Sequence, residues 1–135
     1  AQACTLAELL DRHAPGFRPP RLEAKALVQH HCHHYAVMGF GPDRRLLERM
    51  GLDAEVLESG CCGMAGSFGF ERGDHYDVSV AVGERVLLPR VREADPDTLV
   101  VADGFSCRTQ IEQGTGRHPL HLAEVMRLAL DPERP

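Results

Sequence analysis

The run Thr98–Ala102 is the feature that most limits how this chain can fold. Its residues, Thr-Leu-Val-Val-Ala, are all β-branched or aliphatic, a pattern typical of a strand buried on both faces of a parallel sheet. Apolar runs at residues 26–30, 55–57 and 119–121 also predict strands. Parallel strands need long crossover connections, so helices are expected between these runs.

Helical patterns do separate the predicted strands. Thr5 with Glu8 predicts a capping box before an N-terminal helix. Further helices are predicted at residues 43–50, 74–94, 108–113 and 122–130. In the first of these, Asp43 is the expected cap. In the second, the valines between 78 and 87 are expected in the core and Pro89 is expected to interrupt the helix.

This alternation predicts the class and layout of the fold. We expect one α/β domain over residues 1–135, with a mostly parallel four-stranded sheet, helices on both faces and a preceding N-terminal helix. The hydrophobic share of 43% and the charged share of 26% are those of a soluble globular protein.

Charge and hydropathy exclude some functions. The formal net charge of −5 argues against nucleic acid as a partner. The sequence has no transmembrane segment, which leaves peripheral membrane association open. The N-terminal residues do not resemble a secretory signal, so a cytoplasmic location is expected. In that compartment five cysteines favour metal ligands or reactive thiols over disulfides. The start at Ala1 suggests a processed chain or a fragment.

Four cysteines follow three successive predicted strands. Cys32 comes after the first strand, Cys61 and Cys62 after the second, and Cys107 after the third. In an open parallel sheet, ligands bind at the carboxyl ends of the strands. The topology therefore predicts that these four thiols meet at one edge. Cys4 precedes the first predicted strand and is expected to be incidental.

Four thiolates favour zinc or an iron–sulfur cluster. Two features favour the cluster. The chain lacks the paired C-x2-C knuckles of structural zinc sites, and adjacent cysteines such as Cys61 and Cys62 can each reach a different iron. The glycines at 60, 63, 66 and 69 leave the backbone free to approach sulfur closely. His33 and His34 beside Cys32 are further candidates, as metal ligands or as hydrogen-bond donors.

The motifs HCHH, GCCGMAGSFGFE, VVADGFSC, QIEQGTG and HLAEV give the chain a family resemblance. It resembles the cysteine-rich CCG domain family, which includes a heterodisulfide reductase component and the glycolate oxidase iron–sulfur subunit. The match is closest to the C-terminal module of FAD-linked oxidases fused to iron–sulfur modules. It covers roughly residues 5–130. In that family the motif ends in C-x-x-C, whereas this chain has Gly104-Phe105-Ser106-Cys107. That leaves four ligands and favours an ordinary cubane over a non-cubane cluster.

The resemblance implies an electron-transfer role. The chain would hold a 4Fe–4S cluster within a flavin-dependent dehydrogenase for D-2-hydroxy acids of the glycolate, D-lactate or 2-hydroxyglutarate type. FAD would lie on a partner domain or subunit, and an electron acceptor would be a further partner. The isolated chain is not expected to be catalytic. Two alternatives stay open: a structural zinc or Cys/His site in an interaction domain, and thiol–disulfide chemistry by the vicinal pair.

Overall fold

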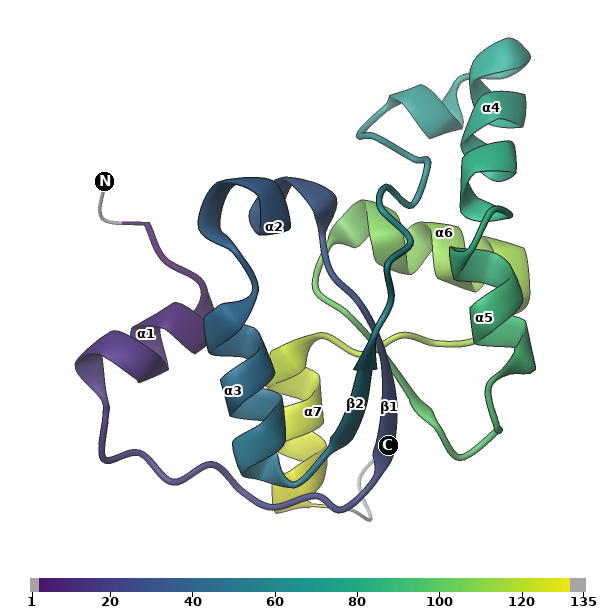
Figure 1. Cartoon of the computed structure of the whole chain (residues 1–135). Coiled ribbons are helices and arrows are strands. Elements are labelled where there is room, and N and C mark those ends of the chain that lie inside the picture. The colour runs from purple at the N-terminus through teal and green to yellow at the C-terminus, as the bar shows by residue number, and fades with distance from the viewer. Residues whose placement is uncertain (1–2, 132–135) are drawn as a thin grey trace.

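A parallel sheet of three strands organises residues 3–131, the part of the chain that the computed structural model describes. Strand β1 (Lys25–Gln29) lies between β2 (Asp53–Val56) and β3 (Leu99–Ala102). All three strands run in the same direction, so their carboxyl ends share one edge of the sheet, which faces upward near the centre of Figure 1. We call this edge, with the connections 30–34, 57–63 and 103–107 that leave it, the rim.

The predicted fourth strand is reduced to one bridge. Leu120 pairs with Val101: its N–H donates to the Val100 carbonyl (2.8 Å) and its carbonyl accepts from Ala102 N (2.9 Å). Pro119 has no N–H to extend the ladder. The four-stranded prediction is therefore wrong in this detail, while the α/β class is confirmed.

Helices cover both faces of the sheet, as Figure 1 shows. Helices α1 (Leu6–His13), α3 (Gly41–Met50) and α7 (Leu122–Leu130) share one apolar core, which includes Val28 and Val101. Helices α5 (Leu87–Glu93) and α6 (Phe105–Thr115) share a second core with Leu27 and Val100. Alternate residues of β1 and β3 therefore enter opposite cores, which makes this sheet the middle layer.

The N-terminal helix is capped as predicted. The Thr5 hydroxyl accepts from Glu8 N (3.2 Å), and the Glu8 carboxylate accepts from Thr5 N (3.0 Å). Helix α7 begins with a similar arrangement, in which His121 Nδ1 accepts from Ala123 N (3.0 Å) and the Glu124 carboxylate accepts from His121 N (2.7 Å). Across residues 3–131, every helix is too short or too polar to cross a membrane.

The predicted helix over residues 74–94 is two helices. Helix α4 (Asp74–Gly83) ends before α5 begins, and Pro89 lies in the first turn of α5, where a missing N–H costs little. The valine stripe was also assigned wrongly, because Val78 is half exposed while Ser79 and Gly83 are the buried residues of α4. Helix α4 rises from the body of the molecule near the rim (Figure 1).

Candidate metal centre

The rim carries four of the five cysteines. Cys32 is the first residue of α2 (Cys32–Met38), a helix that the sequence did not predict. Cys61 and Cys62 lie in the connection that follows β2, and Cys107 lies in the first turn of α6. Cys62 and Cys107 are buried, and Cys32 and Cys61 are half-buried. Cys4 is exposed ahead of α1, as expected of an incidental residue.

The four thiols interact with one another in two linked pairs. A hydrogen bond with the Cys107 thiol is the largest cause that lowers the pKa of Cys62, to about 6, and the amides of Met64 and Ala65 act in the same direction. The same pairing raises the pKa of Cys107, and the charges of Cys32 and Cys61 add to it. Burial is the main cause that raises the pKa of Cys61, which is also next to Cys32. The four side chains therefore form one electrostatic group.

The Cys61–Cys62 connection depends on close backbone approach. Gly63 has φ +98°, and a Cβ at this position would lie 2.1 Å from the Ser79 carbonyl oxygen. Its N–H lies 3.3 Å from Cys61 Sγ and donates to it. A Cβ at Gly69 would lie 2.5 Å from Ser79 Oγ. Helix α4 thus presses against the cysteine loop at positions where side chains are absent.

Two buried glutamines, which the sequence analysis missed, support the connections that carry the thiols. Gln29, at the end of β1, donates from Nε2 to the carbonyls of His30 (2.9 Å) and Gly60 (3.3 Å), and its Oε1 accepts from the Ser59 hydroxyl. It therefore joins the Cys32 connection to the Cys61 connection. One signal was available, because a glutamine that ends an apolar strand of a parallel sheet needs partners.

The second glutamine belongs to the helix that carries Cys107. Gln110 is buried in α6 and donates from Nε2 to the Ser79 carbonyl (3.0 Å), the same oxygen that faces Gly63. This bond links α6 to α4 and, through α4, to the cysteine loop. The positions of Cys62 and Cys107 are therefore coupled by buried polar contacts as well as by their own pairing.

Gly104 stands where the related C-x-x-C motif would place its first cysteine. A Cβ at Gly104 would lie 2.7 Å from His31 Cδ2 and 3.3 Å from Cys107 Sγ. The His31 ring therefore fills the space beside the backbone at this position. His31 also caps α2, where its Nδ1 accepts from His34 N at 3.4 Å. The side chain that packs beside Gly104 thus also supports the helix that begins at Cys32.

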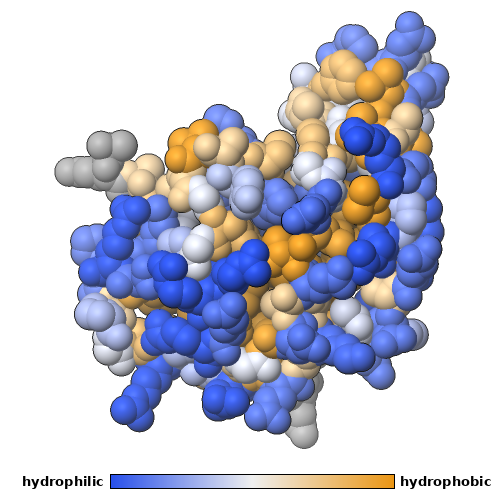
Figure 2. Space-filling model, viewed as in Figure 1, coloured by the Kyte–Doolittle hydropathy of each residue, from blue (hydrophilic) through white to orange (hydrophobic). Residues whose placement is uncertain are grey.

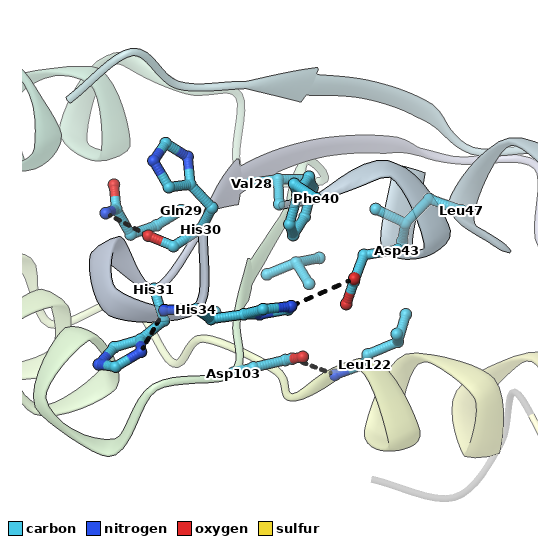
Figure 3. Close-up of a pocket in the computed structure, with 12 residues that line it drawn as sticks. Val28, Gln29, His30, His31, His34, Phe40, Asp43, Leu47, Asp103 and Leu122 are labelled. Atoms are coloured by element: carbon cyan, nitrogen blue, oxygen red, sulfur yellow. Dashed lines mark hydrogen bonds and ion pairs between the residues drawn. The ribbon is translucent and has the colours of Figure 1, made fainter. Parts of the chain in front are cut away.

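The two candidate histidines, His33 and His34, differ in exposure. His33 is exposed on α2. The His34 ring turns inward, and its Nε2 lies 3.6 Å from Asp43 Oδ2 across a small cavity below α2 (Figure 3). Asp43 is not the expected helix cap: Phe40 precedes α3, and Asp43 is buried in its first turn. Burial raises the pKa of Asp43, while His34 acts in the opposite direction.

The donors at the rim fit an iron–sulfur cluster by type and number. Cubane clusters are held by four cysteine thiolates, and four thiols lie at this edge. The lowered pKa of Cys62 favours the thiolate form that binds metal. Within residues 3–131, no three His, Cys, Asp or Glu side chains are arranged to hold a single metal ion. Ligands of a cluster bind different irons and need not converge on one point.

Known proteins similar to this chain are dehydrogenases. Over 75 residues it is 41% identical to one subunit of the anaerobic glycerol-3-phosphate dehydrogenase of Escherichia coli K12, a match that covers 53% of this chain and 18% of that subunit. Over 103 residues it is 32% identical to D-2-hydroxyglutarate dehydrogenase of the same organism. This match covers 72% of this chain and 10% of that protein. D-2-hydroxyglutarate dehydrogenase of Pantoea ananatis is 33% identical over 95 residues.

The chain is therefore similar to parts of larger redox enzymes. The chain spans between about a tenth and a fifth of the length of these relatives. No family model and no solved structure matches it significantly. The similarity therefore supports an oxidoreductase subunit or module.

Proposed function

We propose that this chain is a CCG-type electron-transfer module of a larger flavin-dependent oxidoreductase. Its 4Fe–4S cluster is held by Cys32, Cys61, Cys62 and Cys107, with one thiolate for each iron. The observation that carries the proposal is the meeting of four interacting thiols, from three separate connections, at one edge of a parallel sheet. Residues 1–135 form the module, and the FAD belongs to a partner domain or subunit.

The names of two relatives support our proposal for the substrate class of the whole enzyme. Both are D-2-hydroxyglutarate dehydrogenases, so we assign the larger enzyme to D-2-hydroxy acids of the glycolate, D-lactate or 2-hydroxyglutarate type. We assign electron transfer to this chain and the substrate chemistry to the partner domain or subunit that holds the FAD.

The residues around the thiols suit the charge of a cluster. A bound cluster would supply one-electron acceptance and release. Backbone N–H groups at Gly63, Met64 and Ala65 are directed at cysteine sulfur, and such donors stabilise negative charge and raise a reduction potential. The burial of Cys62 and Cys107 keeps water from that side of the site.

Apolar side chains beside the rim support contact with a partner protein. Tyr35 and Val37 are exposed on α2, and Phe105 is exposed at the start of α6, close to Cys107. Figure 2 shows hydrophobic side chains gathered over α2 and along α4. Exposed apolar groups that cluster at one edge are typical of protein interfaces. An electron donor or acceptor that docks here would approach the thiols closely.

Oxygen-free purification and reconstitution test the proposal. The intact chain should bind iron and acid-labile sulfide in roughly equal amounts and show the broad visible absorption of a 4Fe–4S cluster. Changing Cys32, Cys61, Cys62 or Cys107 singly to serine should lower the cluster content, while Cys4→Ser should leave it unchanged. Stoichiometric zinc without colour would instead establish the metal-binding interaction domain. Colourless protein without metal after reconstitution would contradict both.

A further inference from the structure

Helix α2 brings Cys32 to the rim but has little packing of its own. It spans only Cys32–Met38, and every side chain of α2 except those of Cys32 and His34 is exposed. Short helices are marginally stable without tertiary contacts. The His31 cap fixes the start of the helix, and Gly39 ends it with φ +76°. Tyr35 contacts the His30 ring, with centroids 4.4 Å apart, and His34 makes the contact that joins the helix to α3.

His34 reaches the core at a buried carboxylate. Its side chain is 11% exposed, that of Asp43 is 2% exposed, and 3.6 Å separates His34 Nε2 from Asp43 Oδ2. Within residues 3–131, His34 Nε2 and both oxygens of Asp43 have no closer hydrogen-bond partner. A buried polar group without a partner is costly, so each of these side chains depends on the other.

The residues around the His34–Asp43 pair orient the His34 ring toward Asp43. The Phe40 ring lies edge-on to His34, with centroids 6.2 Å apart. The cavity of about 10 Å³ beside the pair is also lined by Asp103, the first residue of the Cys107 connection. Asp103 is already engaged, because its Oδ1 accepts from Leu122 N at 2.8 Å. Figure 3 shows the His34 ring pointing toward Asp43, on the side opposite His31.

The geometry points to Asp43 as a positioning residue for the thiol site: through His34 it holds α2 against α3 and so sets the place of Cys32 beside Cys61. This inference rests on the proposed function for its purpose, because a cluster requires its ligands at fixed positions. It assigns His34 to support of Cys32, not to ligation. Asp43 touches neither thiols nor cluster and acts only through the helix.

The test measures cysteine alkylation in reduced, metal-free protein. Each cysteine is followed by mass spectrometry during reaction with iodoacetamide at one fixed pH. In Asp43→Ala, Cys32 should react on the order of tenfold faster than in the unmodified chain, because α2 opens locally, while Cys107 keeps its rate. Hydrogen exchange should accelerate in α2 and not in α6. Asp43→Asn, which keeps a polar partner for His34, should restore most of the protection.

Control variants separate positioning from general effects. Asp74→Ala removes an exposed first-turn carboxylate from α4 and should leave the Cys32 rate unchanged. If Asp43→Ala does not fold, Asp43→Asn combined with His34→Ala removes the ring without leaving a buried charge, and the same selective rise in the Cys32 rate is expected. An unchanged Cys32 rate, or an equal rise at all four cysteines of the rim, would overturn the inference.

Cluster measurements on the same variants distinguish this inference from the proposed function. If the unmodified chain forms a cluster, Asp43→Ala should change its electron paramagnetic resonance spectrum and reduction potential, and Asp43→Asn should restore them. A cluster with unaltered properties, together with an unchanged Cys32 rate, would refute the positioning role alone. A selective rise in the Cys32 rate in a chain that never binds iron would refute the proposed function alone.

Discussion

Gly104 shows how a single residue limits the number of thiols at the rim. Its missing side chain leaves space that the His31 ring occupies, and that ring also caps the helix of Cys32. A fifth cysteine at this position would have to displace the cap. The close contact between Gly104 and the His31 ring therefore agrees with a rim of four thiols.

Substitution of Gly104 should be costly because of that contact. Gly104→Ala should lower the free energy of unfolding by about 1–3 kcal/mol, since its Cβ would lie 2.7 Å from His31 Cδ2. Chemical denaturation measures this. Gly16→Ala is the control, because a Cβ at Gly16 meets no atom within 4 Å. Equal costs at the two positions would show that His31 yields without penalty.

Cys62 should make the stability of the metal-free protein depend on pH. Its pKa of about 6 in the folded chain is below the ordinary 9.0, so the unfolded chain binds the proton more tightly. The contribution of Cys62 to stability is therefore present above pH 9, decreases as the pH falls, and is lost below pH 6. The pKa of Cys107 is raised above 9.0. Cys107 therefore lowers the stability of the folded protein as the pH rises, but only above that ordinary value.

Denaturation of reduced protein at a series of pH values measures this effect. Stability should rise between pH 6 and pH 9 in the unmodified chain, and the slope should be smaller in Cys62→Ser. Cys4→Ser should retain the full slope, because Cys4 is exposed and lies outside the rim. An identical slope in Cys62→Ser would contradict the assignment of the low pKa to Cys62.

At the scale of elements, the contact between α4 and the cysteine loop predicts a difference between two glycines. Gly63 and Gly66 both have positive φ, but only at Gly63 would a Cβ meet the Ser79 carbonyl oxygen, at 2.1 Å. Gly66→Ala should cost about 1–2 kcal/mol from backbone strain. Gly63→Ala should cost at least about 3 kcal/mol, because strain and collision add. Thermal unfolding of the two variants tests whether α4 is packed tightly on the loop.

Gln29 predicts a coupling between β1 and the connection after β2. Gln29→Leu leaves the Gly60 carbonyl and the Ser59 hydroxyl without their partner and should lower stability by about 1–3 kcal/mol. It should also reduce the iron content after reconstitution, because Cys32 and Cys61 lose a shared support. Gln113→Leu, at an exposed position of α6, is the matched control. Unaltered iron content in Gln29→Leu would confine the role of Gln29 to stability.

The elements that the sequence predicted well have local signals. Apolar runs located β1 and β3, the Thr5–Glu8 spacing located the start of α1, and α7 has the predicted bounds. Helix α2 was missed because its side chains are mostly exposed and its order depends on His31 and His34. The valines of α4 misled the prediction, because this helix packs through Ser79 and Gly83 against a loop distant in sequence.

The same distinction applies to the candidate site. Strand order and cysteine spacing were enough to place Cys32, Cys61, Cys62 and Cys107 at one edge. The roles of Gln29, Gln110 and Asp43 could not be predicted in the same way. Each is buried by contacts with segments that are distant in the sequence. Glutamine and aspartate mostly lie at the surface of proteins, so the residue type alone predicts an exposed position.

For the whole molecule, two cores on either side of the sheet predict a fold that does not require metal. Each core contains buried side chains from a strand and at least two helices, unlike small domains that fold only with zinc. Metal-free protein should keep its far-ultraviolet circular dichroism, and its melting temperature should be lower than that of the loaded form, because ligands stabilise the state that binds them. Unfolding on metal removal would favour a structural metal.

The position of β1 between β2 and β3 has a consequence for biosynthesis. Three of the four thiols follow the first two strands in the chain, and these strands pair directly with each other. The fourth thiol follows β3, which pairs with β1 from the other side. A ribosome must therefore synthesise the whole segment from Cys32 to Cys107 before the set is complete, so the machinery that delivers a cofactor would meet a finished acceptor only after β3 and the start of α6 have emerged.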